Sequence, residues 1–308
     1  AEGTIAALAS ALGGPKHKND SNTSLLARYI DTIQINSSNA FTDTVLRDGI
    51  DGPTKSHYGN VWSTSASSQP PGTSTADSAY GNGALPLHTD FTYTRNPPGL
   101  QIFAMRSNTN VKGGHSVFSD GLAVAEHLRQ EHPLAFHTLC HTPRRYRSLD
   151  EHSGWHFEAT GPIFDAVDLL SASISTDGND NCHPLHSLSN PHLRWGKVQS
   201  IRHNDLDRLP DIPPPTIPND NAYLNHQFYQ NLENAHDALN ATLASNEFRL
   251  VLNLQPGDAV VVANQRCLHG RYRFETTEHN PRDVIGCYVS QDELDSRFRC
   301  LGRHLETE

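Results

Sequence analysis

The sequence predicts a mainly β fold with helices, in which a double-stranded β-helix (jelly roll) core is supported by α-helices. Two observations indicate this class. Short apolar runs bounded by turn-forming residues dominate the chain from residue 85 to residue 290, which is typical of antiparallel double-sheet proteins. One long amphipathic pattern and one or two shorter helical patterns account for most of the remaining patterned sequence.

The N-terminal part differs in composition from the rest. Residues 4–12 predict a short helix, whereas residues 16–57 are polar and weakly patterned. Residues 62–78 are rich in Ser, Thr and Pro and predict a long loop, of the kind that often forms a lid or a binding loop. We therefore expect an N-terminal helix and polar insertion over 1–57, followed by a jelly-roll domain over 58–308.

The spacing of apolar residues predicts the main elements of this domain. The clearest helix is expected over about 222–245, where apolar residues recur every three or four positions. They are Phe228, Leu232, Ala235, Leu239 and Leu243. A second helix is expected over 121–132. Strands are expected at 100–105, near 197–202, on both sides of the Pro-Gly-Asp turn at 256–258, and at 283–290.

Charge and cysteine content exclude several classes of protein. The formal net charge of −10 argues against a nucleic-acid partner, because such a protein needs a basic face. No apolar run approaches the length that spans a bilayer, so we expect no membrane insertion. The five cysteines are an odd number without a CxxC pair, which favours a reducing intracellular compartment. The mitochondrial matrix and the cytoplasm both fit this expectation.

A histidine and a carboxylate follow an apolar stretch at "LPLHTD". His88 and Asp90 are two positions apart, and a β-strand sends residues at this spacing to the same face. His269 follows the apolar strand at 259–263 and precedes Gly270, which lets the backbone turn while the imidazole faces inward. Two histidines and one carboxylate leave three positions of an iron ion open. Zinc prefers a closed set with thiolates or a third nitrogen, which the sequence does not offer at suitable spacing.

An arginine follows this histidine along the chain. Arg282 lies thirteen positions after His269, and a strand-turn-strand return would bring it back beside the metal. A guanidinium group binds a carboxylate through two parallel hydrogen bonds, so Arg282 suits one end of a dicarboxylic cosubstrate. A surface arginine in a salt bridge is the alternative, and the spacing alone does not decide between them.

Several ordered motifs together carry a family resemblance. They run from about residue 58 to residue 301 and are "YGNVW", "ADSAY", "LHTDFTY", "PPGLQIF", "GGHSVFSDG", "IRHNDLDR", "PGDAVVVANQRCLHGR" and "RDVIGCYVS". In this order and spacing the chain resembles the iron(II)/2-oxoglutarate-dependent oxygenases of the taurine-dioxygenase-like superfamily. Within them it is most similar to the branch of γ-butyrobetaine dioxygenase and trimethyllysine dioxygenase.

The resemblance implies a cofactor set and its ligands. His88, Asp90 and His269 match the iron(II) ligands of the family. Arg282 matches the arginine that holds the distal carboxylate of 2-oxoglutarate, and Ser116 lies where relatives place a small hydroxyl residue near that carboxylate. The implied cosubstrates are 2-oxoglutarate and O2, with ascorbate as the reductant.

The resemblance also implies a small-molecule trimethylammonium substrate. Tyr58, Trp62, Tyr80 and Tyr288 match the aromatic cage of the family. A quaternary ammonium donates no hydrogen bond, so ring faces must hold it, at about 0.5–2 kcal/mol for each cation–π contact. Asp77 would pair with the α-ammonium group of an amino-acid substrate and would repel a bare carboxylate.

The implied reaction is hydroxylation of N6,N6,N6-trimethyl-L-lysine at C3, the first step of carnitine biosynthesis, with succinate and carbon dioxide as coproducts. Asn204 is a candidate for the carboxylate end of this substrate, and Arg202 is an alternative. Hydroxylation of γ-butyrobetaine or of another trimethylammonium compound stays open, as does a non-catalytic betaine-binding module.

The chain departs from the family at several points. It shows no counterpart of the N-terminal zinc module, so dimerisation through that module is not implied and a homodimer stays open. Gln265 stands where relatives usually have tryptophan, and Asp205 stands where asparagine is common.

Overall fold

The structure is a computed structural model that describes residues 61–64, 81–108, 112–150, 154–169, 194–214, 217, 221–275 and 282–305, with side chains described up to residue 300. The helix expected at 4–12, the insertion at 16–57 and most of the loop expected at 62–78 lie outside these residues. The loop prediction is wrong at its start, because residues 62–63 form a short strand. The domain boundary expected after residue 57 therefore stays a prediction.

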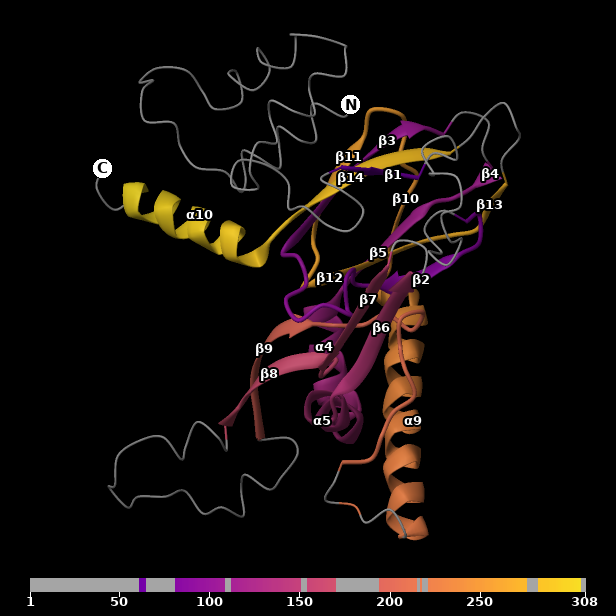
Figure 1. The fold of residues 1–308 in the computed structure, drawn as a ribbon, viewed down its shortest axis with the longest axis vertical. Helices are drawn as coiled ribbons and strands as arrows, with labels where there is room; N and C mark the ends of the chain where they lie inside the picture. The colour runs from indigo at the N-terminus through magenta and orange to yellow at the C-terminus, as the bar shows by residue number, and fades with distance from the viewer. Residues whose placement is uncertain are drawn as a thin grey trace.

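Two four-stranded antiparallel sheets form the core of the fold (Figure 1). The first sheet has the order β1 (Trp62–Ser63), β14 (Asp283–Val289), β3 (Leu100–Ser107) and β11 (Ala259–Ala263). The second has the order β10 (Leu250–Leu252), β5 (Ser116–Asp120), β12 (Cys267–Arg271) and β2 (Leu85–His88). The consecutive strands β10, β11 and β12 alternate between the two sheets, as in a double-sheet jelly roll. The mainly β fold class predicted from the sequence is confirmed.

The central strand β3 shows why its sequence forms a buried strand. Its first six residues are all buried, which explains why five of the six are apolar instead of alternating with polar residues. Successive side chains still point to opposite faces. Leu100, Ile102 and Ala104 join one apolar cluster, whereas Phe103 and Met105 join another. The strand is therefore packed on both sides.

Three helices gather beside the second sheet (Figure 1). They are α4 (Gly121–Glu131), α5 (Pro133–His141) and α9 (Ala222–Ala244). Their apolar faces share one core cluster with β5 and β12, which includes Val117, Val124, Leu139, Leu239 and Leu268. The helix predicted over 222–245 is confirmed, because four of its five apolar positions are buried and only Phe228 is half-buried.

Side-chain caps begin two of these helices. The carboxylate of Asp120 accepts a hydrogen bond of 3.0 Å from the backbone N–H of Leu122 at the start of α4. The amide oxygen of Asn221 accepts one of 3.0 Å from Leu224 at the start of α9. Each cap satisfies one of the backbone donors that a helix leaves unpaired at its first turn.

Several elements were not predicted from the sequence. They are α5, the hairpin of β6 (Arg144–Asp150) and β7 (Trp155–Gly161), the strand β8 (Phe164–Asp168) that pairs with β9 (Trp195–Ile201), the short strands β4 (Lys112–Gly113) and β13 (Phe274–Glu275), the 3-10 turn η4 (Asn246–Phe248), and α10 (Gln291–Leu305). Helix α10 leads away from the end of β14 (Figure 1). None of the helices in the described ranges is long and apolar enough to cross a bilayer.

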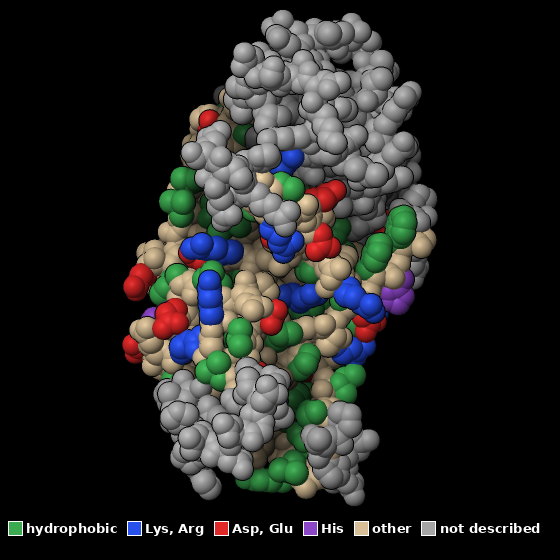
Figure 2. Space-filling model, turned by 90° about the vertical axis from the view of Figure 1, so that its left-hand side faces the viewer, with side chains coloured by type: hydrophobic (Ala, Val, Ile, Leu, Met, Phe, Trp, Pro, Cys, Tyr) green, Lys and Arg blue, Asp and Glu red, His purple; other side chains and the backbone are tan. Residues whose placement is uncertain are grey.

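The described surface carries charges of both signs. On the face drawn in Figure 2, Lys and Arg side chains are interspersed with Asp and Glu side chains.

Candidate metal centre

Two histidines meet across neighbouring strands of the second sheet. His88 is the last residue of β2, and His269 is the residue directly opposite it on β12. Side chains of directly opposed residues lie on the same face of a sheet and close together. The centroids of the two imidazole rings are accordingly 4.4 Å apart.

Asp90 lies beside the two histidines, but for a different structural reason from the one that the sequence suggested. The strand argument for His88 and Asp90 is wrong, because β2 ends at His88 and Asp90 lies in the turn that follows. Asn264, which is fully buried, fixes this turn. Its amide oxygen accepts from the Asp90 N–H at 2.8 Å, and its amide nitrogen donates to the Asp90 carbonyl at 3.0 Å and to the Pro98 carbonyl at 3.1 Å.

The turn also holds an unusual backbone conformation. Phe91 has a φ of 60°, in the left-handed region that residues other than glycine rarely adopt. Its ring packs edge-on against Tyr288, with centroids 4.7 Å apart. Strained residues of this kind concentrate at functional sites.

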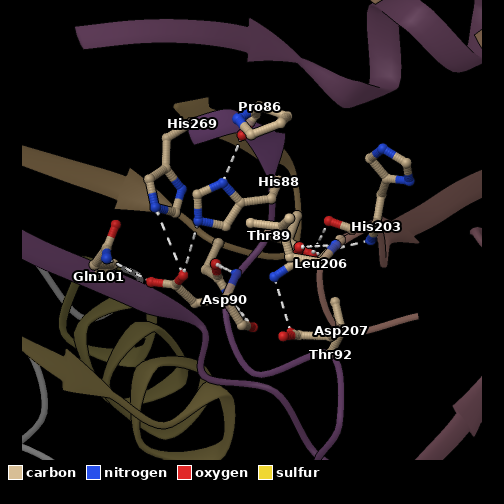
Figure 3. Close-up of polar contacts among 12 residues, drawn as sticks. Pro86, His88, Thr89, Asp90, Thr92, Gln101, His203, Leu206, Asp207 and His269 are labelled. Carbon is tan, nitrogen blue, oxygen red and sulfur yellow. Dashed lines mark hydrogen bonds and ion pairs between the residues drawn. The ribbon is translucent and has the colours of Figure 1, made fainter. Parts of the chain in front are cut away.

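One carboxylate oxygen of Asp90 faces both imidazoles (Figure 3). Oδ1 lies 3.3 Å from Nε2 of His88 and 3.7 Å from Nε2 of His269. Ligands at about 2.1 Å from a metal and at right angles to each other are roughly 3 Å apart. Within the part of the chain that the structure describes, these three residues are the only group of three or more His, Cys, Asp or Glu side chains able to share an ion.

Hydrogen bonding prepares His88 as a ligand. Its Nδ1 lies 2.8 Å from the carbonyl oxygen of Pro86, so Nδ1 carries the proton that is donated and Nε2 keeps its lone pair for a metal. Burial lowers the pKa of His88, but the hydrogen bond and the charge of Asp90 outweigh this effect and raise it. Burial lowers the pKa of His269 to about 4, so this imidazole is neutral at neutral pH.

The second oxygen of Asp90 accepts hydrogen bonds from two other side chains. The Tyr288 hydroxyl donates to Oδ2 at 2.9 Å, and the Gln101 amide donates to the same oxygen. Burial raises the pKa of Asp90, but the charge of His269 and the contacts with His88 and Tyr288 lower it to about 2. The carboxylate is therefore ionised at neutral pH, as a metal ligand must be.

Arg282, directly before β14, is buried, and no counter-ion lies beside it among the described residues. It is 7% exposed, and in the described part of the chain no carboxylate pairs with it and its Nε has no hydrogen-bond partner. Its guanidinium lies over the Phe274 ring, 5.4 Å from the centroid. Burial lowers its pKa to about 10, so the group stays charged at neutral pH and is prepared to bind an anion.

A second buried arginine was not predicted from the sequence. The Arg271 guanidinium also lies over the Phe274 ring, 4.6 Å from its centroid. This group donates to the carbonyl oxygens of Gly81 and Gly83 at 2.7 and 3.1 Å. Burial, with a smaller effect of the Arg282 charge, lowers its pKa to about 10. Ser116, the predicted hydroxyl residue, is buried on β5 opposite Arg271.

The predicted substrate residues are described only in part. The rings of Trp62 and Tyr288 lie 6.1 Å apart, inclined at 36°. Tyr58, Asp77 and Tyr80 lie outside the described residues.

The two candidates for the substrate carboxylate contact the protein itself. The Asn204 amide donates to Asp207 at 2.8 Å, and its oxygen accepts from the Leu206 N–H at 3.0 Å. The Arg202 guanidinium donates to three backbone carbonyls, of Thr92, Thr94 and Arg95. In this structure both side chains stabilise turns, and their roles toward a substrate stay predictions.

A cavity of about 510 Å³ adjoins the cluster without containing its three candidate ligands. Phe91, Arg202, Gln265 and Tyr288 are among the residues that line it. Tyr288 is therefore common to the cavity wall and to the hydrogen bonds around Asp90.

Two packed antiparallel sheets that carry a two-histidine, one-carboxylate group define a jelly-roll protein able to hold a metal with open coordination positions. The sequence profile of the taurine catabolism dioxygenase TauD, TfdA family matches residues 30–288. The chain belongs to this family.

Two named dioxygenases are similar to this chain in sequence. The chain is 29% identical over 252 residues to the mitochondrial trimethyllysine dioxygenase of Mus musculus, covering 80% of this chain and 48% of that one. It is 31% identical over 229 residues to the gamma-butyrobetaine dioxygenase of Pseudomonas sp. (strain AK-1), covering 74% and 49%. The chain thus spans about half the length of these relatives.

The solved structures that match this chain share less sequence identity with it. The crystal structure of asparagine oxygenase in complex with Fe(II), 2S,3S-3-hydroxyasparagine and succinate has a TM-score of 0.48 at 13% identity, covering 90% of this chain and 69% of that one.

Proposed function

We propose that the chain is an iron(II)- and 2-oxoglutarate-dependent dioxygenase that hydroxylates N6,N6,N6-trimethyl-L-lysine at C3, with succinate and carbon dioxide as coproducts. The observation that carries this proposal is the meeting of His88, Asp90 and His269 at one point. The buried Arg282, which has no carboxylate partner in the described part of the chain, supports it independently. The named relatives support the choice of substrate class.

The three ligands determine what chemistry the centre allows. Bound iron(II), with 2-oxoglutarate and O2, supplies the oxidising power that replaces a C–H bond by a C–OH bond, and ascorbate keeps the metal reduced. His88, Asp90 and His269 would hold the ion, and three protein ligands would leave positions open for the cosubstrate and O2. The protein contributes by positioning the reactants around these positions.

Arg282 binds the distal carboxylate of 2-oxoglutarate in this proposal. An uncompensated buried guanidinium gains more from a carboxylate than an exposed one does, because water competes less. Its planar group donates two parallel hydrogen bonds, which fix the orientation of the cosubstrate. Ser116 would add a hydroxyl group near the same carboxylate.

Aromatic rings bind the trimethylammonium end. Trp62 and Tyr288 already lie 6.1 Å apart, and Tyr58 and Tyr80 would complete the cage. Each ring face contributes about 0.5–2 kcal/mol of cation–π attraction. Asp77 would bind the α-ammonium of trimethyllysine, and Asn204 or Arg202 would lie near its carboxylate.

γ-Butyrobetaine is the second candidate substrate. The 31% identity to the bacterial gamma-butyrobetaine dioxygenase favours it. Its carboxylate end carries no α-ammonium group, so Asp77 would repel that end. A non-catalytic module that binds a betaine is the remote alternative, and an open metal site would serve no purpose in such a module.

Turnover of a substrate panel tests the proposal. Purified protein is incubated with iron(II), ascorbate, 2-oxoglutarate and either trimethyllysine or γ-butyrobetaine. Mass spectrometry then measures the gain of one oxygen atom and the release of succinate. We expect trimethyllysine to be hydroxylated faster, and Asp77→Asn to shift the preference toward γ-butyrobetaine. If neither trimethyllysine nor γ-butyrobetaine gives succinate, these two substrates are rejected. If a wider set of trimethylammonium compounds also gives no succinate, the non-catalytic binding module is favoured.

His269→Ala is the control for the metal. We expect this variant to fold and to lose turnover, because one of the three ligands is gone. Retained activity would reject the iron assignment. For the compartment we propose the mitochondrial matrix or the cytoplasm, which cell fractionation distinguishes.

A further inference from the structure

Two cross-strand pairs face each other around Asp90. In the second sheet, His88 lies directly opposite His269. In the first sheet, Gln101 on β3 lies directly opposite Tyr288 on β14. The first pair faces Oδ1 of the carboxylate, and the second pair donates hydrogen bonds to Oδ2.

The Gln101–Tyr288 pair is buried at a place where apolar residues would otherwise be expected. Gln101 is 4% exposed and Tyr288 is 6% exposed. Gln101 interrupts the apolar run of β3, and its amide nitrogen also lies 3.5 Å from the Tyr288 hydroxyl oxygen. Burying a polar side chain is costly unless its hydrogen bonds are made. The two donors therefore have a stabilising role only while the Asp90 carboxylate lies between the sheets.

We propose that Gln101 and Tyr288 are positioning residues that restrict Asp90 to a single metal-ligand oxygen. A carboxylate can bind a metal through one oxygen or through both. Binding through both would require Oδ2 to give up hydrogen bonds from two buried donors, which leaves those donors unsatisfied. The pair thus holds Oδ2 away from the metal and leaves Oδ1 between the two imidazoles.

The way in which Asp90 binds determines how many coordination positions of the metal stay open. A six-coordinate ion held by His88, His269 and one oxygen of Asp90 keeps three positions open, whereas a chelating Asp90 leaves two. The inference rests on the proposed function, because a keto acid that binds through two atoms and O2 together need three positions. Gln101 and Tyr288 therefore keep the third position available.

Tyr288→Phe and Gln101→Leu test the inference by metal binding rather than by turnover. Tyr288→Phe keeps the ring that packs on Trp62 and Phe91 and removes only the hydroxyl. Tyr146→Phe is the matched control. Tyr146 is 1% exposed, belongs to the same aromatic cluster and donates to the Arg202 carbonyl at 3.0 Å. The Tyr146→Phe variant therefore loses a buried hydroxyl of the same kind, but this hydroxyl makes no hydrogen bond to Asp90.

Calorimetric titration with Mn(II), followed by 2-oxoglutarate, gives the first readout. We expect each variant to change the Kd for Mn(II) and to weaken 2-oxoglutarate binding to the loaded protein about tenfold, because a chelating Asp90 fills one of the three positions. The Tyr146→Phe control should bind Mn(II) as the wild type does. Visible d–d absorption of Co(II)-loaded protein gives the second readout, since its intensity and position change with coordination number. The spectrum should differ from that of the wild type in Tyr288→Phe and Gln101→Leu, but not in Tyr146→Phe.

The outcomes separate this inference from the proposed function. Variants that bind Mn(II) and 2-oxoglutarate as the wild type does, with an unchanged Co(II) spectrum, would overturn the positioning role. Equal losses in Tyr288→Phe and Tyr146→Phe would also overturn it, since they would show a general packing effect. Wild-type protein that binds the metal but hydroxylates neither substrate would overturn only the proposed function, and wild-type protein that binds no metal would overturn both.

Discussion

Asn264→Ala should destabilise the protein more than any ordinary loss of one hydrogen bond. The side chain is fully buried and makes three hydrogen bonds to backbone groups around Asp90. Removing it leaves the Asp90 N–H, the Asp90 carbonyl and the Pro98 carbonyl without these partners. Each unsatisfied buried group costs about 1–3 kcal/mol. Allowing for water entering the space, we expect a loss of roughly 3–5 kcal/mol.

Urea unfolding of metal-free protein measures this loss without a contribution from metal binding. Gln265→Ala, at the next position, is the matched control. Gln265 is half-buried and makes one hydrogen bond, of 2.9 Å, to the Pro97 carbonyl, so its loss should cost about 0.5–1.5 kcal/mol. We also expect Asn264→Ala to weaken Mn(II) binding, because the turn that carries Asp90 is released. A midpoint shift no larger than that of Gln265→Ala would refute the view that Asn264 fixes the ligand turn.

Three further predictions use the charged and capping residues. Arg282→Met should weaken 2-oxoglutarate binding at least tenfold in calorimetry while leaving the urea midpoint equal or higher, since it removes an unpaired buried charge; a large loss of stability would show a structural ion pair instead. Burial lowers the pKa of His203 to about 4 from 6.5, so stability should fall as the pH drops from 6.5 to 4, by up to about 3 kcal/mol. The unfolded chain binds a proton there that the folded chain does not, and His203→Leu should reduce this slope in urea unfolding of metal-free protein at several pH values, leaving the part that His269 contributes, since burial also lowers the pKa of His269 to about 4; an unchanged slope would contradict the assignment. Asp120→Ala should cost about 1 kcal/mol through loss of the cap on Leu122, measured by thermal unfolding, whereas Asp120→Asn should retain most of it.

Local patterns were sufficient for much of the fold. The helical spacing of Leu232, Ala235 and Leu239 predicted α9, because those residues must face one core. The apolar runs at 100–105 and 283–290 predicted β3 and β14, which are the strands buried on both faces. Elements without a strong apolar period were not predicted, such as β7, whose residues are mostly exposed or half-buried.

The sequence predicted which residues are candidate ligands, but their proximity depends on the tertiary structure. The register that sets His88 opposite His269 depends on the pairing of β2 with β12, which are far apart in the sequence. The position of Asp90 depends on Asn264, so the strand argument could not have produced it. The sequence did contain a signal for the missed residues. Gln101 and Asn264 are amides within or directly after apolar strands, and a buried amide requires hydrogen-bond partners.

The central claim is that His88, Asp90 and His269 bind one metal ion together. A crystal structure of the protein with Mn(II), with anomalous data collected for manganese, tests it most directly. We expect one anomalous peak between Nε2 of His88, Nε2 of His269 and Oδ1 of Asp90, with Oδ2 still hydrogen-bonded to Tyr288 and Gln101. An ion bound elsewhere, or these three side chains turned away from it, would show that they do not form a metal site.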